Sequence, residues 1–360
     1  MNRRHWICAD VWLDILPSFD RPQLGLKMAL LSDRFDVLVD AHFDGKSELT
    51  IWRTIGIHKD KGPKPKLSEW IDGKLVDFPL PDRPLPNRIR FKHLNIRYID
   101  YSVIEFLRSN KQIWDRSGTN LDLSIANIQP IWDVFVREIW PIFTTNLRHL
   151  SFAGHDHLGN LRRRISPTLL TDLDQLDSIF SNFLFPDVIA DDGPNETARQ
   201  VLSKWLHTPS KNGQPKRLHC RDYYGRPKTL ERVSNLKEAF LRAISFVSYI
   251  IRINRVRTMP TELFELENER TKEKLTLEKV SRYDDVVNWL LKRCPIIVGE
   301  TEATVQWEND KNWDDNYLNY VQFELWRGNY SIGPLSPTST EEKADQSNQN
   351  VVGVRGSELQ

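Results

Sequence analysis

The sequence predicts an α/β protein with a small helical module at its amino end, an irregular βα domain in the middle and a small β-hairpin sheet near its carboxyl end. Three observations lead to this fold class. Apolar residues recur at helical spacing within the first forty residues. Strand-like apolar patterns then return near positions 94, 123, 150 and 176, with helical patterns between them. Finally, residues 264–277 alternate between apolar and polar on both sides of a polar turn, as hairpins do.

Two short apolar patterns in the amino-terminal part flank a proline-containing turn at residues 17–22. The first brings Val11, Ile15 and Leu16 close together, and the second runs from Leu24 to Leu31. Residues three and four positions apart lie on one face of a helix, so each pattern predicts an amphipathic helix. Because chains this short are marginal folding units, they cannot bury so much apolar surface alone. We therefore expect a docking surface for another protein.

This segment resembles an F-box, the short helical module that joins a substrate receptor to the Skp adaptor of a cullin ubiquitin ligase. Asp10 stands at the acidic position of the family pattern, and residues 31–35 (Leu-Ser-Asp-Arg-Phe) stand at its Val-Ser-x-Arg-Phe string. Ile7-Cys8 replaces the usual Leu-Pro. The resemblance implies that the adaptor is contacted by Ile7, Asp10, Val11, Ile15, Leu16, Leu24, Leu26, Leu31 and Phe35. The alternative is an ordinary helical hairpin that begins a globular domain or caps its first repeat.

The composition is typical of a soluble protein from a reducing compartment. The 50 Lys and Arg nearly balance the 49 Asp and Glu, so no overall field favours nucleic acid or an anionic membrane. Cys8, Cys220 and Cys294 are scattered, with neither a disulfide pattern nor metal-ligand spacing. The first residues lack the apolar run of a secretory signal, and no stretch approaches the length of a membrane span. We expect a cytoplasmic or nuclear protein.

Residues 46–86 are predicted to form a linker between residues 1–45, the helical module, and residues 87–330, the βα domain. The linker contains a short strand pattern at residues 47–52 and a Lys-rich, Pro- and Gly-broken stretch at residues 58–66. It ends in a proline-rich segment, residues 79–86, that predicts a stiff extended spacer. Beyond the βα domain, residues 331–360 are polar and are predicted to be a disordered tail.

The middle of the chain is similar to a leucine-rich repeat. Residues 91–96 and 147–152 fit the strand pattern Leu-x-x-Leu-x-Leu, and weaker versions occur at 121–125, 173–179, 217–220 and 246–253. The first four strand centres are 29, 27 and 26 residues apart, at the upper end of the range for such repeats. We predict a degenerate βα solenoid with parallel strands and helices behind them. A compact α/β domain is the alternative.

The predicted hairpin at residues 264–277 is followed by two further strand patterns, residues 289–296 and 321–326, which we assign to the same small capping sheet. Residues 264–296 also resemble the closing part of expanded nematode F-box families, and the likeness extends over much of residues 6–325. This resemblance implies a divergent substrate receptor and brings no catalytic residues with it.

The sequence offers little to support catalysis. His155-Asp156-His157 could present two imidazoles and a carboxylate to a metal, but no further ligand stands at a known spacing, so we predict a solvated loop. Phosphate-binding loops, nucleophile elbows and zinc-protease motifs are absent from the sequence. We therefore expect an adaptor without enzyme activity, cofactor or metal that binds the Skp adaptor and a protein substrate. The alternatives are a ligase-independent interaction scaffold and a hydrolase that uses His155 or His157 beside a nucleophile in a deep pocket.

Overall fold

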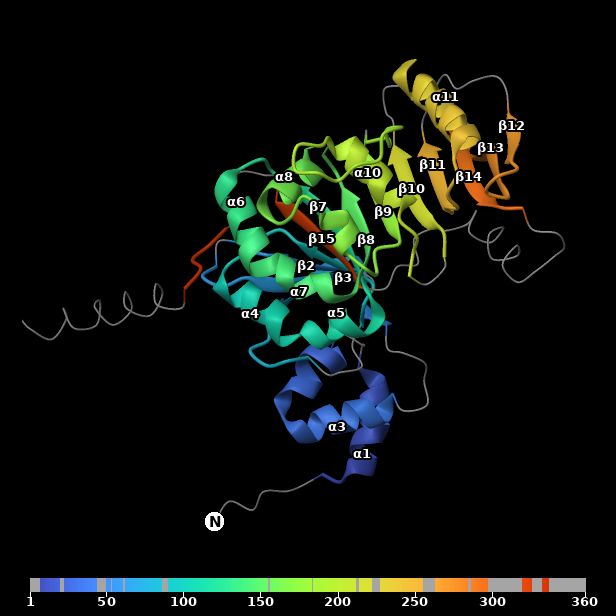
Figure 1. Ribbon diagram of the computed structural model, residues 1–360. Helices are drawn as coiled ribbons and strands as arrows, with labels where there is room; N and C mark the ends of the chain where they lie inside the picture. The colour runs from blue at the N-terminus through green and yellow to red at the C-terminus, as the bar shows by residue number, and fades with distance from the viewer. Residues whose placement is uncertain are drawn as a thin grey trace, which may run out of the picture.

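The structure, a computed structural model, is a mixed α/β protein with one large sheet, helices on one side of that sheet and a helical module at one end (Figure 1). It describes residues 7–19, 23–43, 50–52, 54–60, 62–85, 90–154, 156–182, 184–211, 214–221, 227–254, 263–283, 286–296, 319–325 and 332–336. Within these ranges, no helix combines the length and the apolar character needed to cross a membrane.

The large sheet has thirteen strands in the order β12-β13-β14-β11-β10-β9-β8-β7-β15-β6-β2-β3-β4. The eight strands from β11 to β2 run parallel, and an antiparallel group continues the sheet at each end. A separate short pair joins β1 to β5. The strands are β1 (Thr50–Trp52), β2 (Ile55–His58), β3 (Lys66–Ile71), β4 (Lys74–Pro79), β5 (Arg90–Phe91), β6 (His93–Ile96), β7 (Thr119–Ile125), β8 (Leu147–Phe152), β9 (Ser178–Asn182), β10 (Lys216–Arg221), β11 (Tyr249–Asn254), β12 (Phe264–Asn268), β13 (Glu273–Tyr283), β14 (Val286–Pro295) and β15 (Tyr320–Leu325).

The parallel strands align in one register, which places apolar residues in a continuous row beneath the helices. The row consists of Ile55, Leu94, Val321, Leu121, Leu150, Ile179, Leu218 and Ile251, all of them fully buried. Because successive side chains on a strand point to opposite faces, the residues between these project from the other side of the sheet. Those residues are mainly polar. The alternation therefore gives the sheet one apolar face and one polar face.

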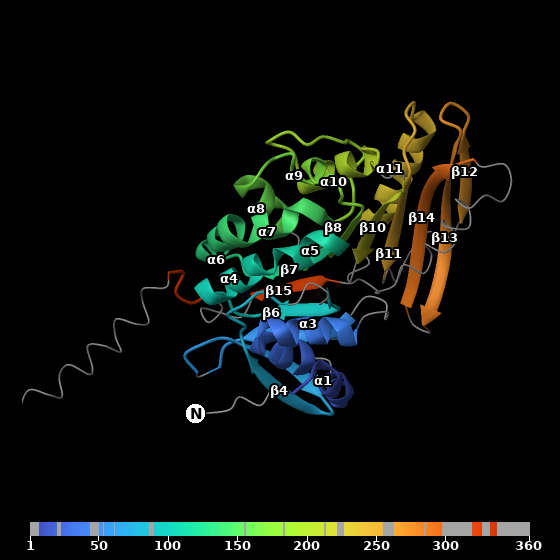
Figure 2. The same cartoon turned by 90° about the horizontal axis from the view of Figure 1, so that it is seen from below.

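Helices connect the parallel strands and lie along the apolar face, as Figures 1 and 2 show for α4 to α10. Each strand from β8 to β11 lies beside its predecessor, and successive crossovers that share one direction and one hand place these connections on the same face. The helical segments are α4 (Tyr101–Ser109), α5 (Lys111–Ser117), α6 (Gln129–Val134), η4 (Phe135–Ile139), α7 (Trp140–Phe143), η5 (Thr144–Asn146), α8 (His157–Arg164), α9 (Leu169–Asp172), α10 (Ala198–His207) and α11 (Pro227–Arg242).

Local sequence signals set the beginnings of these helices. Asp100 begins α4, where its carboxylate accepts a hydrogen bond from the Val103 amide at 3.0 Å. Thr197 and Gln200 form a reciprocal capping box at the start of α10. Each cap satisfies backbone donors that have no partner within the helix. Both helices carry apolar side chains that are buried in the core, such as Leu107 on α4 and Trp205 on α10.

The amino-terminal module consists of α1 (Ala9–Ile15), η1 (Leu16–Ser18), η2 (Leu24–Met28), η3 (Ala29–Leu31) and α3 (Asp33–His42). It lies at the β4 end of the sheet, below the other helices in Figure 1. The Lys27 ammonium lies 5.2 Å from the centre of the Phe78 ring on β4, and Arg83 pairs with Asp33 at 2.6 Å. These contacts attach the module to the β3–β4 hairpin and to the segment that follows it.

Several sequence predictions agree with the structure at the level of elements. The strand patterns near 94, 123, 150, 218 and 250 correspond to β6, β7, β8, β10 and β11, all parallel. The pattern at 173–179 precedes and overlaps β9 by two residues. The hairpin at 264–277 is confirmed as β12 and β13, and residues 289–295 lie in β14.

Three expectations need correction. Residues 55–79, expected within a linker, form β2, β3 and β4 of the large sheet because Ile55, Leu67 and Phe78 alternate with polar residues and are buried. The carboxyl-terminal hairpin is no separate small sheet, since β14 pairs with β11. The pattern at 321–326 belongs to β15, which inserts between β6 and β7 instead of joining a capping sheet.

The start of the expected disordered tail is ordered against the sheet, while residues 337–360 lie outside the described residues. Ile332 forms a parallel bridge with Ile99, and the Gly333 amide donates to the Ile99 carbonyl at 2.7 Å. A Cβ at Gly333 would lie 1.8 Å from the Tyr98 hydroxyl, so this close approach requires glycine.

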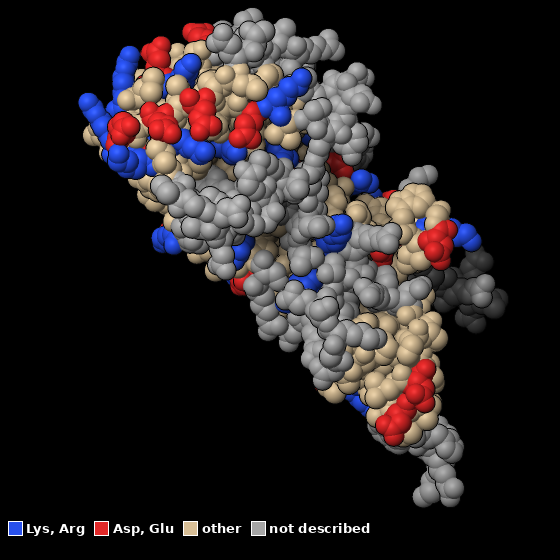
Figure 3. All heavy atoms as spheres, turned by 90° about the vertical axis from the view of Figure 1, so that its right-hand side faces the viewer, with Lys and Arg blue, Asp and Glu red and all other residues tan. Residues whose placement is uncertain are grey.

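Charged side chains cover the outer antiparallel strands. Figure 3 shows Lys and Arg next to Asp and Glu over the end of the sheet that carries β12 and β13. Lys274 on β13 lies 3.6 Å from Glu265 on β12, and Lys292 on β14 lies 2.6 Å from Glu278 on β13. Charges along an outer strand oppose pairing with a strand of another molecule.

Candidate functional site

The amino-terminal module exposes a group of apolar side chains that its own core does not use. Ile7 and Val11 are each 44% exposed, and Leu31 is 63% exposed. All three belong to the set that the F-box resemblance assigns to the adaptor, and Asp10 beside them is also exposed. Single exposed apolar residues are ordinary on a protein surface, but these three, with Val37 exposed as well, make the small module a candidate for contact with a partner.

The remaining residues of that set are half-buried or buried. Ile15 and Phe35 are half-buried. Leu16, Leu24 and Leu26 are buried in the core of the module, where they pack with residues such as Leu38 and Val39 on α3. A direct contact of these three leucines with a partner is therefore no longer expected. Their role in this structure is to stabilise the module, because burying a leucine contributes roughly 1.5–3 kcal/mol.

Residues 32–35 hold the two longest helices of the module together. Ser32 begins α3 and accepts a hydrogen bond from the Phe35 amide at 3.4 Å. The Arg34 guanidinium donates to the Ile7 carbonyl at 2.5 Å, which ties α3 to the residues before α1. The Phe35 ring lies edge-on to Trp12 of α1, with ring centres 4.8 Å apart. Residues 32–35, which belong to the string that resembles the F-box pattern, thus position both Ile7 and helix α1.

Carboxylates along α3 give this module a local acidic character. Asp33, Asp36 and Asp40 follow one another at helical spacing on α3. Burial, together with the neighbouring charges of Asp40 and Asp33, raises the pKa of the Asp36 carboxyl. A partner that contacts α3 would relieve this repulsion if it carried Lys or Arg.

The polar face of the parallel sheet is a second candidate surface. One row across it contains Asn95, Gln322, Asp122, Ser151, Phe180, His219 and Arg252. Hydrogen bonds connect these side chains to their neighbours. The Tyr320 hydroxyl donates to Asp122 at 2.6 Å, and Asn95 and Arg97 donate to Glu324 at 3.1 and 2.8 Å. The carboxyl-terminal strand β15 thus supplies much of the polar surface between β6 and β7.

Ionisable groups on this face are shifted towards their neutral forms. Burial lowers the pKa of His149 to about 4. Burial, with Arg252 and Arg221 nearby, lowers the pKa of His219 to about 3. Burial also raises the pKa of the Asp122 carboxyl, against the hydrogen bonds from Tyr320 and Ser151. Neutral imidazoles that already bond to Ser178 and Asn254 suit a hydrogen-bonding surface better than proton transfer.

Of the two histidines in the His155-Asp156-His157 segment, the structure describes only His157, and His155 lies outside the described residues. The Nε2 atom of His157 accepts the Ile125 amide at 3.1 Å, so its lone pair is used to cap the end of β7. Burial lowers the pKa of the His157 imidazole, and the ring packs against Trp132. His157 therefore serves the end of a strand.

A cavity of about 630 Å³ lies between α8 and the beginning of α10. Arg162 is on its wall, but its guanidinium donates to the carbonyls of Pro167, Glu196 and Gly193 at 3.0, 2.6 and 2.7 Å. The Thr197 hydroxyl on the same wall bonds to Gln200 in the capping box. Among the residues lining this cavity there is no serine, cysteine or histidine, so the hydrolase alternative finds no nucleophile–base pair here.

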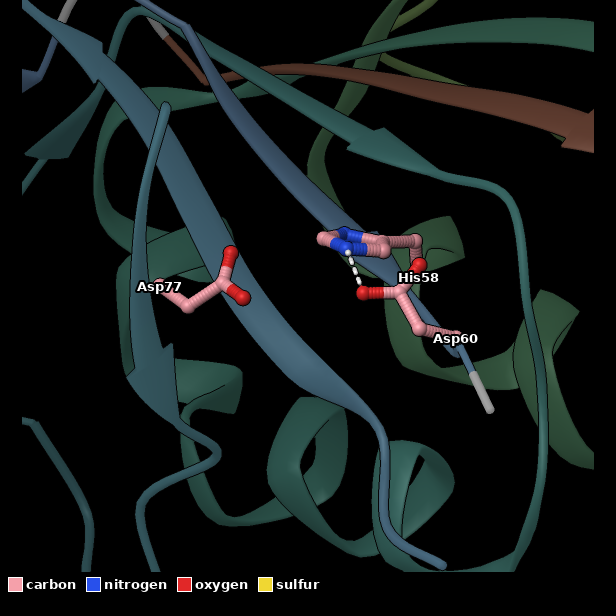
Figure 4. A group of neighbouring side chains, drawn as sticks. All are labelled: His58, Asp60 and Asp77. Atoms are coloured by element: carbon pink, nitrogen blue, oxygen red, sulfur yellow. Dashed lines mark ion pairs between the residues drawn. The ribbon is translucent and has the colours of Figure 1, made fainter. Parts of the chain in front are cut away.

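A cluster of possible metal ligands lies near the β4 end of the sheet, on β2, on the loop that follows β2 and on β4. His58, Asp60 and Asp77 bring one imidazole nitrogen and two carboxylate oxygens within 4.8 Å of one another. Figure 4 shows His58 and Asp77 pointing towards each other across β3, with Asp60 close to the imidazole. The sequence shows no motif for this cluster, because its members come from separate parts of the β2–β4 hairpins.

Comparison with known proteins does not assign this chain to a family: no family model, no curated protein and no solved structure matches it. The function of this chain is therefore inferred from its own residues. Two surfaces stand out among the described residues, namely the exposed side of the helical module and the polar face of the sheet.

Proposed function

We propose that this protein is a substrate-recognition adaptor of a cullin-type ubiquitin ligase, in which the amino-terminal module binds a Skp-type adaptor and the βα domain binds a protein substrate. The chain itself carries out no chemistry in this role. It raises the effective concentration of a substrate lysine near the conjugating enzyme, which accelerates transfer by proximity.

One observation carries the proposal: the module exposes Ile7, Val11 and Leu31, although its buried leucines join the apolar core of the protein. A module that only capped the sheet would turn such residues towards the sheet. Instead, Lys27 contacts Phe78 on β4, and Asp33 pairs with Arg83 in the segment after β4. The exposed apolar side chains are thus available to a partner, and they coincide with positions of the F-box resemblance.

The form of the sheet supports the second half of the proposal. Apart from β15, its parallel strands follow one another across the sheet in chain order, with helices on one face. Small-molecule sites in open α/β sheets occur where the strand order reverses, and the strands from β7 to β11 contain no such reversal. A broad polar face of this kind is better suited to a protein segment than to a small ligand.

The test is co-purification with a Skp-type adaptor after a double substitution, Val11→Asp with Leu31→Asp. Both side chains are exposed, so the module should remain folded while the contact loses apolar area and gains charge. We expect adaptor binding to weaken at least about a hundredfold, since burying two unpaired carboxylates costs several kcal/mol.

The matched control is Ile244→Asp. Ile244 is 81% exposed and follows α11, at the opposite end of the molecule from the module (Figure 1). This variant should bind the adaptor like the unmodified chain. Unchanged binding by the double variant would contradict the proposal, as would a chain that binds no adaptor at all. Leu16 and Leu24 are unsuitable targets because charging a buried leucine would unfold the module.

A further inference from the structure

We propose that His58, Asp60 and Asp77 form a binding site for a divalent transition-metal ion, with Zn²⁺ as the best-suited ion. One imidazole nitrogen and two carboxylate oxygens are ligands that Zn²⁺ accepts, with water in the remaining position. Asp60 lies in the loop after β2, and the other two residues lie on β2 and β4. The ion would therefore join the ends of these strands across β3.

The distances suit such an ion with little movement. A tetrahedral ion with bonds of about 2.1 Å holds its ligand atoms about 3.4 Å apart. His58 Nε2 lies 3.4 Å from Asp60 Oδ2, and all three candidate ligand atoms lie within 4.8 Å of one another. Asp77 needs to approach by at most about 1.4 Å, the difference between 4.8 and 3.4 Å, and its side chain is 37% exposed and able to rotate.

A hydrogen-bonded serine orients the imidazole for metal binding. Ser68 Oγ lies 2.8 Å from His58 Nδ1 and 3.4 Å from the Gly56 carbonyl oxygen. If the hydroxyl donates to that carbonyl, it accepts the Nδ1 proton and leaves the Nε2 lone pair directed at the two carboxylates. Metal-binding histidines commonly have their other nitrogen fixed in this way, and Ser68 is itself buried.

Lys66 pairs with one of the three proposed ligands. Its ammonium lies 3.1 Å from Asp77 Oδ2, and the Lys66 side chain is 40% exposed. Exposed ion pairs of this type contribute little to stability, so a divalent ion can displace the ammonium at low cost. The lysine would still repel a bound ion. Removing its charge should therefore strengthen metal binding, a result that a purely structural ion pair would not produce.

The test is titration of the full chain with Co²⁺, followed by its visible absorption, and with Zn²⁺ in competition. The unmodified chain should bind one ion through this cluster. Asp77→Asn and His58→Gln should abolish that binding, and Ser68→Ala should weaken it about tenfold. Lys66→Met should tighten it about tenfold, as expected for the loss of one positive charge close to a divalent ion.

Asp72→Asn is the matched control, because Asp72 is a carboxylate in the turn of the same β3–β4 hairpin and asparagine tolerates its positive φ of 50°. This variant should bind Co²⁺ like the unmodified chain. Circular dichroism verifies that each variant is folded. The proposal is overturned if the folded chain binds no Co²⁺ through these residues, or if Lys66→Met weakens binding. Neither outcome depends on whether the helical module binds a Skp-type adaptor.

Discussion

Arg293 and Glu273 form an ion pair inside the protein, with side chains only 3% and 0% exposed. The guanidinium donates to both carboxylate oxygens at 2.7 to 3.2 Å and to the Ser245 carbonyl at 2.8 Å. The Glu273 carboxylate also accepts the Val247 amide at 2.9 Å. The pair therefore connects β13 and β14 with the loop before β11.

Replacing one member of this pair should be far more costly than its attraction alone would indicate. Arg293→Met leaves the Glu273 carboxylate buried without its counter-charge, which costs about 3–5 kcal/mol of the free energy of unfolding. Urea denaturation measures this loss. The exposed pair Lys272–Glu269 provides the comparison, since Lys272→Met should change stability by less than about 1 kcal/mol. Similar losses in the two variants would contradict the importance assigned to burial.

Exposure also separates residues that look alike in the sequence. Val11, Leu16 and Leu31 are all apolar members of the two amino-terminal helical patterns, yet only Leu16 is buried. Periodicity predicts which residues share a helix face, but it does not specify which neighbours cover that face. The same limit applies to His58 and Asp77, which become neighbours only when β2, β3 and β4 pair.

At the scale of elements, β15 is the strand that sequence reasoning placed least well. Its alternation of apolar and polar residues predicts a strand, and that prediction is confirmed. Its position in the sheet differs from the expected one beside the carboxyl-terminal hairpin. Val321 pairs with Leu94 and Leu121, which are about 200 residues earlier in the chain. Pairing over such a distance leaves no local pattern. In contrast, the β12–β13 hairpin was predictable because its partners are joined by a short turn.

Phe323 provides a direct test of how much β15 contributes to the core. Its side chain is fully buried, and its ring centre lies 5.2 Å from Phe135 and 6.0 Å from Phe143. Phe323→Ala should lower the free energy of unfolding by about 3–5 kcal/mol, because it removes a buried ring and leaves a cavity.

Denaturant unfolding with Leu75→Ala as the reference measures this effect. Leu75 lies on the outer strand β4 and is 51% exposed, so its truncation should cost less than about 1 kcal/mol. A small loss for Phe323→Ala would mean that β15 is not an integral strand of the sheet.

At the scale of the whole molecule, buried histidines make stability depend on pH. Burial lowers the pKa of His93, His149, His157, His207 and His219. In the unfolded chain a histidine takes up a proton near pH 6.5, whereas native His149 resists protonation until about pH 4. Between about pH 6.5 and pH 4 the unfolded state therefore binds more protons than the native state. The free energy of unfolding falls as the pH decreases through this range. The raised pKa of Asp122 acts in the opposite direction, since protonation of that carboxyl favours the folded state.

The expected contribution of His149 is about 2 kcal/mol of stability lost between about pH 7 and pH 5. His149→Gln keeps a hydrogen-bonding group beside Ser178 but cannot be protonated. Denaturant midpoints measured across this range should therefore change less with pH in the variant. An identical pH dependence in both proteins would show that His149 is not protected from protonation in the native state.

The position of β15 also has a consequence for biosynthesis. A chain leaving the ribosome presents β6 and β7 long before residues 320–325 emerge, so the place between these two strands must stay vacant until then. During that interval both strands have unpaired backbone edges, which attract strands of other chains. The nascent protein thus depends on protection of these edges until β15 has emerged, and a ribosome that stops before codon 320 releases a chain without the strand that joins β6 to β7.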